Sequence, residues 1–267
     1  MKIRVPASIA NIGPGFDVLA MAVDLWLEVE AEPSDQPHWR FQGEGAEYLG
    51  ATPNPLSALS WRGEVRCDIP MGVGLGSSAA ARLAAAVLRG ELDPLGSASA
   101  EEGHPDNAAA AWSGGVVMVI EGQVHRLPAA ELELALLVAT LPLPTEQARA
   151  ALPATVPHPD AVFNAARLGL LIHALDGRHY ELLDAATQDR LHQPYREHLY
   201  PFTAAAMAAA RAAGALGSAV CGAGPSVFAF CRPGEGERIA QAMADAAPGR
   251  GRPLATQISP QGLQVWP

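Results

Sequence analysis

Short apolar runs and longer apolar repeats of helical period follow one another along the whole chain. Short or alternating runs predict β-strands, and apolar positions recurring about every three to four residues predict helices. The predicted strands cover residues 2–5, 25–31, 65–69, 116–121, 134–140, 227–231, 254–258 and 263–266. The predicted helices cover residues 77–89, 107–112, 145–151, 160–175, 180–187, 201–213 and 235–246. Because both kinds of element occur in both halves, the pattern predicts an α+β or α/β fold with a domain boundary near residues 122–130.

One stretch, residues 68–90, places glycines and serines directly before an alanine-rich helix. Gly72, Gly74 and Gly76 follow a predicted strand, and Ser77 and Ser78 open the helix. The first N–H groups of a helix lack partners within it and the helix dipole adds positive charge, so a phosphate can bind there. The spacing matches neither G-x-x-x-x-G-K-[ST] nor G-x-G-x-x-G. Taken alone, the stretch is either a phosphate site or a plain connection.

Composition narrows the classes of partner. The 267 residues are 49% hydrophobic, enough to bury a substantial core in one large or two modest domains. A formal charge of -10 without a basic run argues against nucleic acid or an anionic membrane as a partner. Lys2 is the only lysine, so arginine, backbone N–H groups, hydroxyls or a metal must hold any phosphate or carboxylate.

The expected location is the cytoplasm, because the chain shows neither a leader nor a long apolar run. Cys67, Cys221 and Cys231 show no C-x-x-C spacing, and we expect them to be structural free thiols.

Four further clusters hold polar residues that could form a site. They are residues 11–17 after the first strand, residues 101–107 before an alanine-rich helix, the glycine-rich loop 222–226, and Thr145 with Arg149 and Arg196. Each has an ordinary interpretation as well: turn residues, a helix cap with acidic residues in its first turn, a tight turn, and solvated arginines. The combination of all four clusters with the stretch 68–90 favours a site.

The motifs PASIANIGPGFD, PMGVGLGSSAA, EGHPDN and GAGPS, in that order, resemble those of the GHMP family of small-molecule kinases. The family is named for galactokinase, homoserine kinase, mevalonate kinase and phosphomevalonate kinase. The match runs from Val5 to Phe230, and the wording of each motif points to the homoserine kinase branch. The resemblance implies an α+β, two-domain GHMP kinase fold. Residues 1–125 would form an ATP-binding domain with the phosphate loop, like the second domain of ribosomal protein S5, and residues 126–267 a ferredoxin-like domain.

The resemblance also implies transfer of the ATP γ-phosphate to the hydroxyl of L-homoserine, with Mg²⁺, in a protein that forms a homodimer. The implied substrate-binding residues are Asn11, Asp17, His104, Asn107, Thr145, Arg149 and Arg196, of which Asn107, Asp17 and His104 are also the catalytic candidates. The implied ATP-binding residues are Pro70, Gly72, Gly74, Leu75, Gly76, Ser77, Ser78, Ala79, Gly222, Gly224 and Ser226. Ser78 and Glu102 are the implied metal ligands, with Glu101 in reserve.

The chemistry of homoserine agrees with these assignments. A zwitterion with one alcohol needs cations for its carboxylate, an anion for its ammonium and a group that orients its hydroxyl. Arg149 and Arg196 suit the carboxylate, Asp17 the ammonium and Asn107 the hydroxyl. A strong base is not required, because phosphoryl transfer has a loose transition state that positioning and charge neutralisation can serve.

Two regions are shorter than the family pattern. Between Gly45 and Pro70, and again between Arg89 and Glu101, we expect helices of the family to be shortened or missing and the nucleotide side to be reduced. Asn54 stands near a family position beside the adenine, but it lies in a shortened region and is left out of the candidate site. Two alternatives stay open: a kinase of the same fold for another small alcohol, such as mevalonate, and a ligand-binding relative with weak catalysis.

Overall fold

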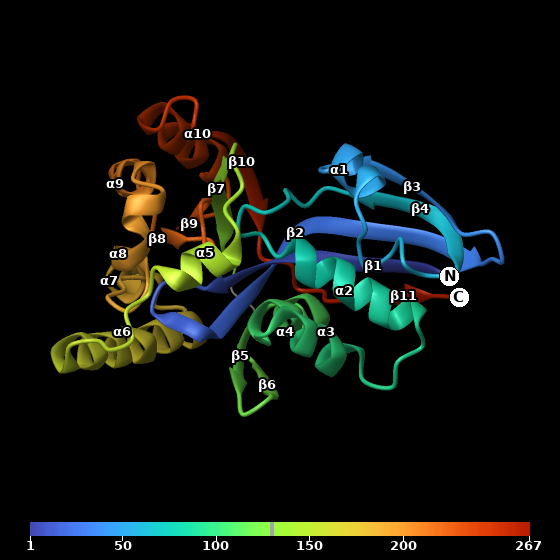
Figure 1. The fold of residues 1–267 in the computed structure, drawn as a ribbon. Coiled ribbons are helices and arrows are strands. Elements are labelled where there is room, and N and C mark those ends of the chain that lie inside the picture. The colour runs from blue at the N-terminus through green and yellow to red at the C-terminus, as the bar shows by residue number, and fades with distance from the viewer. Residues whose placement is uncertain (129–130) are drawn as a thin grey trace.

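The computed structural model describes residues 1–128 and 131–267, which are arranged around two β-sheets (Figure 1). The first elements are β1 (Lys2–Asn11), β2 (Gly15–Pro33), β3 (His38–Gly43), α1 (Ala46–Ala51), β4 (Trp61–Cys67), α2 (Ser77–Leu88), α3 (Pro94–Glu102), α4 (Asp106–Ser113), β5 (Val116–Ile120) and β6 (Gln123–Arg126). The next are β7 (Glu133–Ala139), α5 (Thr145–Ala150), α6 (His158–Asp176), η1 (Tyr180–Leu182), α7 (Leu183–Ala186), α8 (Gln193–Arg196) and η2 (Glu197–Leu199). The last are α9 (Phe202–Ala212), β8 (Gly217–Val220), β9 (Val227–Cys231), α10 (Gly236–Ala246), β10 (Gly251–Gln257) and β11 (Gln264–Trp266).

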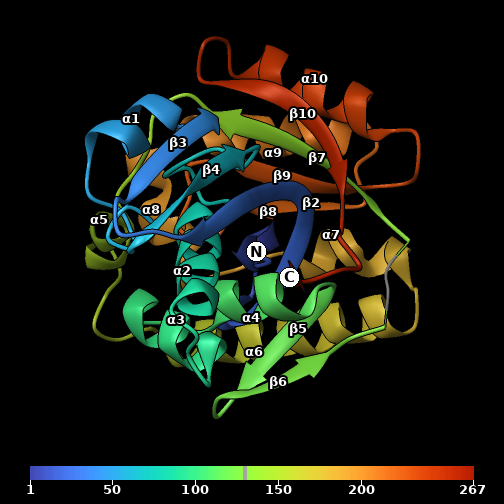
Figure 2. The ribbon, with the colours of Figure 1, turned by 90° about the vertical axis from the view of Figure 1, so that its right-hand side faces the viewer.

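The larger sheet has the order β11-β1-β2-β4-β3, and β5 and β6 extend it from β2. The helices α2, α3 and α4 gather on one side of the long strands β1 and β2 (Figure 2). The buried face of α2 consists mainly of alanines with Leu83 and Leu88, so the helix can lie close to the sheet. This close packing brings the N-terminus of α2 to the end of β1, where the site forms.

The smaller sheet has the order β10-β7-β9-β8, and all of its pairs are antiparallel. Numbered along the chain, these strands stand in the order 4-1-3-2. The helices α9 and α10 cover one face, where Ala206, Ala210, Ile239 and Met243 pack against apolar side chains of β7 and β9. This is the ferredoxin-like arrangement, and the prediction of an α+β fold is confirmed.

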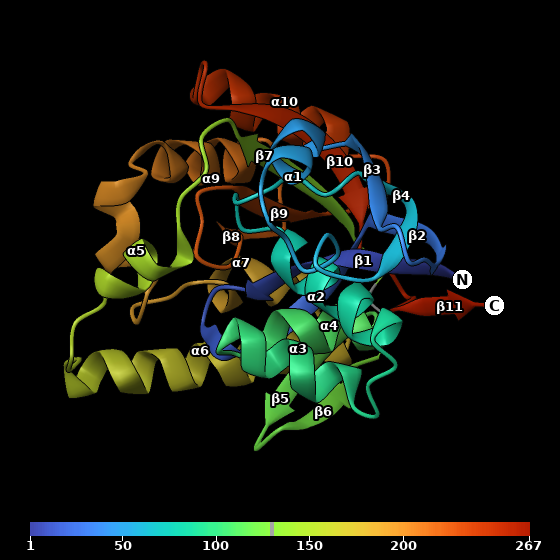
Figure 3. The same ribbon diagram turned by 45° about the vertical axis from the view of Figure 1, so that its right-hand side comes forward.

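The chain passes between the two sheets twice, because β11 returns to the larger sheet and pairs with β1. Figure 3 shows the two ends of the chain side by side. The division into residues 1–125 and 126–267 stays a prediction; β11 lies outside the sheet of the domain to which that division assigns it. In the described part of the chain, no helix combines the length and apolar character needed to span a membrane.

Each of the two short regions contains a helix, α1 with six residues and α3 with nine, so neither helix is missing; that they are shorter than in the family stays a prediction. The α3 helix begins at Pro94, whose fixed φ suits a first helical position. The carboxylate of Asp93 accepts a hydrogen bond from the N–H of Gly96 at 2.9 Å and so caps the helix. A local capping signal therefore forms a helix from a stretch with little apolar periodicity.

Candidate active site

A cavity of about 670 Å³, including its mouth, lies where the end of β1, the start of α2 and two glycine-rich loops meet. Its lining includes all seven predicted substrate residues: Asn11, Asp17, His104, Asn107, Thr145, Arg149 and Arg196. Of the predicted phosphate and metal residues it includes Gly72, Gly74, Leu75, Gly76, Ser77, Ser78, Glu102, Gly222 and Gly224. Pro70, Ala79 and Ser226 are buried and do not line it. Residues predicted from separate motifs thus converge on one space.

The N-terminus of α2 faces this cavity without a side-chain cap. Gly76 precedes the helix with φ 70°, and within residues 1–128 and 131–267 no side-chain cap bonds to the first N–H groups. Gly74, with φ 89°, packs against the second glycine-rich loop, and a Cβ there would collide with the carbonyl oxygen of Cys221. The glycines let the two loops approach each other, and the helix start remains available to an anion.

Asn11 joins the loop after β1 to the second glycine-rich loop. Its Nδ2 donates to the carbonyl oxygen of Gly222 at 2.9 Å, and its Oδ1 accepts from the N–H of Asp17 at 3.1 Å. Asn11, Ile12 and Asp17 have φ values of 72°, 46° and 55°, in the left-handed region that non-glycine residues seldom adopt. The side chain of Asn11 therefore builds the site as well as lining it.

Two arginines and one carboxylate surround the ring of Phe16. Arg149 on α5 forms a two-point ion pair with Asp17, with nitrogen–oxygen distances of 2.7 and 3.1 Å. The guanidinium carbons of Arg149 and Arg196 lie 5.5 and 5.4 Å from the centre of the Phe16 ring. Arg196 on α8 is 1% exposed, and burial lowers its pKa from the ordinary value. The group carries one net positive charge, since arginine stays protonated in proteins, and so favours an anion.

At the start of α4, the buried carboxylate of Asp106 organises its neighbours. Its Oδ1 lies 2.7 Å from Nδ1 of His104 and accepts from the N–H of Asn107 at 2.7 Å. The hydroxyl of Ser8 donates to Oδ1 of Asn107 at 2.9 Å. With those atoms engaged, Nε2 of His104 and the amide nitrogen of Asn107 are the polar atoms left for a ligand in the cavity.

The predicted metal ligands Ser78 and Glu102 both contact the guanidinium of Arg82. Arg82 on α2 donates to the Ser78 hydroxyl at 2.6 Å and pairs with the Glu102 carboxylate. The side chain of Glu102 is 9% exposed and lines the cavity; that of Glu101 is 41% exposed, does not line it and pairs with Arg82 and Arg89. Oε1 of Glu102 is buried, and beyond the ion pair it accepts no hydrogen bond within the described part of the chain. Hard oxygen donors of this kind fit Mg²⁺.

No group of three or more His, Cys, Asp or Glu side chains placed to hold a metal occurs in residues 1–128 and 131–267. A magnesium ion at Ser78 and Glu102 would take its remaining oxygens from phosphates and water, as this ion usually does in kinases. The donor set therefore fits a metal that enters with a nucleotide.

Several residues that support the site were not predicted from the sequence. Phe16 contacts both arginines, Asp106 bonds to His104, and His192 contacts Arg196 at 3.2 Å from within the fold. Asp106 stands in the cluster of residues 101–107 found in the sequence, but its burial was not predicted. The sequence did not indicate a role for His192, because its bond to Gly13 joins positions 179 residues apart. Asn54 is engaged in local hydrogen bonds within its own loop and lies outside the cavity.

Comparison with known proteins identifies the family to which the chain belongs. The C-terminal family model of the GHMP kinases matches residues 171–249. Homoserine kinase from a strain of Thermus thermophilus is 37% identical, with 96% of each chain covered, and that from Gloeobacter violaceus is 42% identical, with 93% of each covered. The crystal structure of homoserine kinase from Cytophaga hutchinsonii superposes with a TM-score of 0.86 at 28% identity, covering 100% of this chain and 97% of that one. This chain is a member of the homoserine kinase family within the GHMP kinases.

Proposed function

We propose that the protein transfers the γ-phosphoryl group of ATP to the hydroxyl of L-homoserine, giving O-phospho-L-homoserine for threonine biosynthesis. The observation that carries the proposal is the cavity itself. Its lining includes two arginines and a carboxylate as well as the N-terminus of α2, which has no side-chain cap. The first group suits the zwitterion of an amino acid, and the helix N-terminus suits phosphates.

In this proposal, Arg196 and Arg149 hold the substrate carboxylate and Asp17 holds its ammonium group. The ion pair between Asp17 and Arg149 shows that the two side chains reach the same point. Asn107 donates its amide N–H to the substrate hydroxyl, because Ser8 already occupies its oxygen. Asn11, Thr145 and His104 complete the wall around the amino acid. Positioning of this kind supplies much of the catalysis of phosphoryl transfer.

The phosphates of ATP lie, in this proposal, along the loop from Gly72 to Gly76 and at the start of α2. The backbone N–H groups there supply hydrogen-bond donors for the phosphates in a chain that has a single lysine. Ser78 and Glu102 would hold Mg²⁺, which when bound neutralises charge on the phosphates. The cationic Arg82 already lies between these two ligands, so this part of the cavity favours positive charge.

The test is an ADP-release assay with ATP and magnesium against homoserine, serine, threonine and mevalonate. We expect homoserine to give by far the highest kcat/KM, because it alone combines a zwitterion with a hydroxyl one carbon beyond that of serine. Phosphorus NMR of the product identifies the phosphate ester. Faster turnover of mevalonate would support a kinase for another alcohol, and no turnover by folded protein would support a weakly catalytic relative. The homodimer and the cytoplasmic location also stay predictions, and sedimentation equilibrium measures the first.

A further inference from the structure

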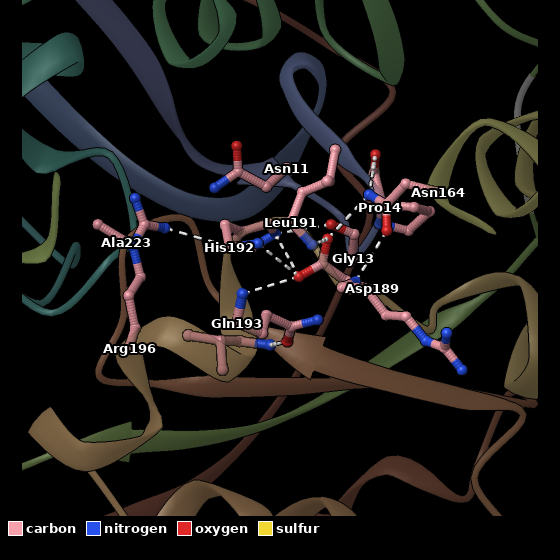
Figure 4. A network of polar contacts seen from close by, with 12 residues as sticks. Asn11, Gly13, Pro14, Asn164, Asp189, Leu191, His192, Gln193, Arg196 and Ala223 are labelled. Atoms are coloured by element: carbon pink, nitrogen blue, oxygen red, sulfur yellow. Dashed lines mark hydrogen bonds and ion pairs between the residues drawn. The ribbon is translucent and has the colours of Figure 1, made fainter. Parts of the chain in front are cut away.

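His192 is completely buried between the loop after β1 and the helix that carries Arg196 (Figure 4). Its Nε2 lies 2.7 Å from the carbonyl oxygen of Gly13, and its Nδ1 lies 3.2 Å from Nη1 of Arg196. A carbonyl only accepts hydrogen bonds and a guanidinium only donates them. The imidazole therefore carries its proton on Nε2, donates to Gly13 and accepts from Arg196. Both bonds are made together only by the neutral ring with this tautomer.

The buried carboxylate of Asp189 fixes the backbone on which His192 stands. It accepts from the N–H groups of Leu191, His192 and Gln193 at 3.0, 3.0 and 2.7 Å. It also accepts from Nδ2 of Asn164 at 2.9 Å, and that amide lies 3.3 Å from the carbonyl oxygen of Pro14. The same network thus reaches the loop after β1 by a second route, visible in Figure 4.

The charges around His192 support the neutral ring. Burial is the largest cause that lowers its pKa, and Arg196 acts in the same direction, whereas Asp189 and Asp17 raise it. Protonation would turn Nδ1 into a donor facing a guanidinium, which would lose the hydrogen bond and add repulsion. Phe16 stacks on the imidazole with a centroid distance of 5.3 Å and closes it off from the cavity. His192 therefore does not touch a ligand in the cavity.

We propose that His192 is a positioning residue that holds Arg196 and the loop of residues 12–14, which leads into Asp17 at the start of β2, in one fixed arrangement, so that the two charged ends of the amino acid are bound at the correct separation. This inference rests on the proposed function. Both ring nitrogens are needed, because one bonds to the carboxylate-binding arginine and the other bonds to the loop that leads into the ammonium-binding Asp17.

Two substitutions separate the two bonds. In His192→Asn, the short amide falls near the position of Nδ1 and can accept from Arg196 but cannot reach Gly13. In His192→Gln, the longer amide falls near Nε2 and can donate to Gly13 but leaves Arg196 without its acceptor. We expect KM for homoserine to rise about tenfold or more in the Gln variant, which loses a charge-assisted bond, and about two- to tenfold in the Asn variant. KM for ATP should stay within about twofold in both.

The exposed His179, changed to Asn, is the matched control and should leave both KM values and the melting temperature unchanged. Equal rises in both KM values in the His192 variants would assign His192 a purely structural role and overturn the inference. An unchanged KM for homoserine would overturn it too. Absence of homoserine turnover by the unaltered protein would overturn the proposed function, and the inference would fall with it.

A measurement on the unaltered protein tests the inference even if the variants fail to fold. Nitrogen-15 NMR of histidine-labelled protein should show one imidazole in the Nε2–H form that does not titrate between about pH 6 and 9. Its Nδ1 signal should shift when L-homoserine is added, because Arg196 then shares its donors with the substrate. A ring that is protonated, or that carries its proton on Nδ1, would overturn the inference.

Discussion

Replacing Arg196 with lysine keeps the charge and removes the planar group. Arg196 is 1% exposed, and its Nε donates to the carbonyl oxygen of Ala148 at 2.9 Å while Nη1 donates to His192 at 3.2 Å. These two bonds leave the Nη2 side of the guanidinium for the substrate carboxylate. A lysine ammonium has no fixed fork and cannot satisfy all three directions with the same geometry. The Arg196→Lys variant must therefore give up at least one charge-assisted hydrogen bond.

One lost charge-assisted hydrogen bond costs about 1.5 to 3 kcal/mol, which corresponds to a roughly 10- to 150-fold decrease in kcat/KM for homoserine. Arg149→Lys is the matched comparison. Its side chain is 39% exposed and pairs with a carboxylate that is 36% exposed. Exposed ion pairs contribute up to about 1 kcal/mol, so Arg149→Lys should lower kcat/KM about fivefold or less. The buried arginine should therefore be the more sensitive of the two.

Initial rates are measured with varied homoserine at saturating ATP, and then with varied ATP at saturating homoserine. The two series show for which substrate the kinetic constants change. We expect the loss in Arg196→Lys to appear on the homoserine side and KM for ATP to change less than about twofold. Thermal melting establishes that each variant is folded. Equal effects of the two substitutions, or no effect of Arg196→Lys, would refute the reasoning from burial and geometry.

Three further predictions concern other parts of the molecule. Glu102→Gln should raise the magnesium concentration needed for half-maximal activity several-fold more than Glu101→Gln does, because only Glu102 lines the cavity; the opposite order would assign the metal to Glu101. Gly74→Ala should lower the free energy of unfolding in urea by about 2 to 5 kcal/mol, whereas Gly90→Ala, which has open space around its Cβ and φ 70°, should cost about 1 to 2 kcal/mol. The three buried cysteines should react with a thiol reagent at about pH 8 only after unfolding, since burial raises the pKa of Cys67 to about 11 and keeps it protonated below that pH. Rapid labelling of the native protein would contradict the last of these.

Local sequence signals predicted much of the fold. Every strand and helix predicted from apolar periodicity has a counterpart, and most of them have a buried face whose apolar residues recur with a regular spacing in the sequence. The pattern did not show that β1 continues to Asn11 and that β2 begins at Gly15, since glycine, proline and asparagine there read as turn residues. It also missed β8, a four-residue strand of small side chains that is buried by its neighbours.

The candidate site also has a part that the sequence predicted and a part that it did not. The cavity lining was predictable because its residues stand in short motifs that resemble those of a known family. The residues that hold the lining in place were not, because their partners are distant: His192 bonds to Gly13, and Asn164 bonds to Pro14. Hydrogen bonds between residues more than a hundred positions apart leave no periodic trace in one sequence. The roles of the individual residues stay predictions until the variants are measured.

The second passage of the chain between the sheets limits how the molecule can move. After β10 the chain crosses back, forms a bridge between Val23 and Ile258 in passing, and ends as a strand on β1. A part of the chain that is joined to the rest by two segments can separate from it only if both segments yield, so the second passage restrains the relative movement of the two sheets. One apolar core that continues from β1 and β2 into β7 and β9 acts in the same direction. The cavity draws side chains from elements next to both sheets, and its shape depends on this restraint.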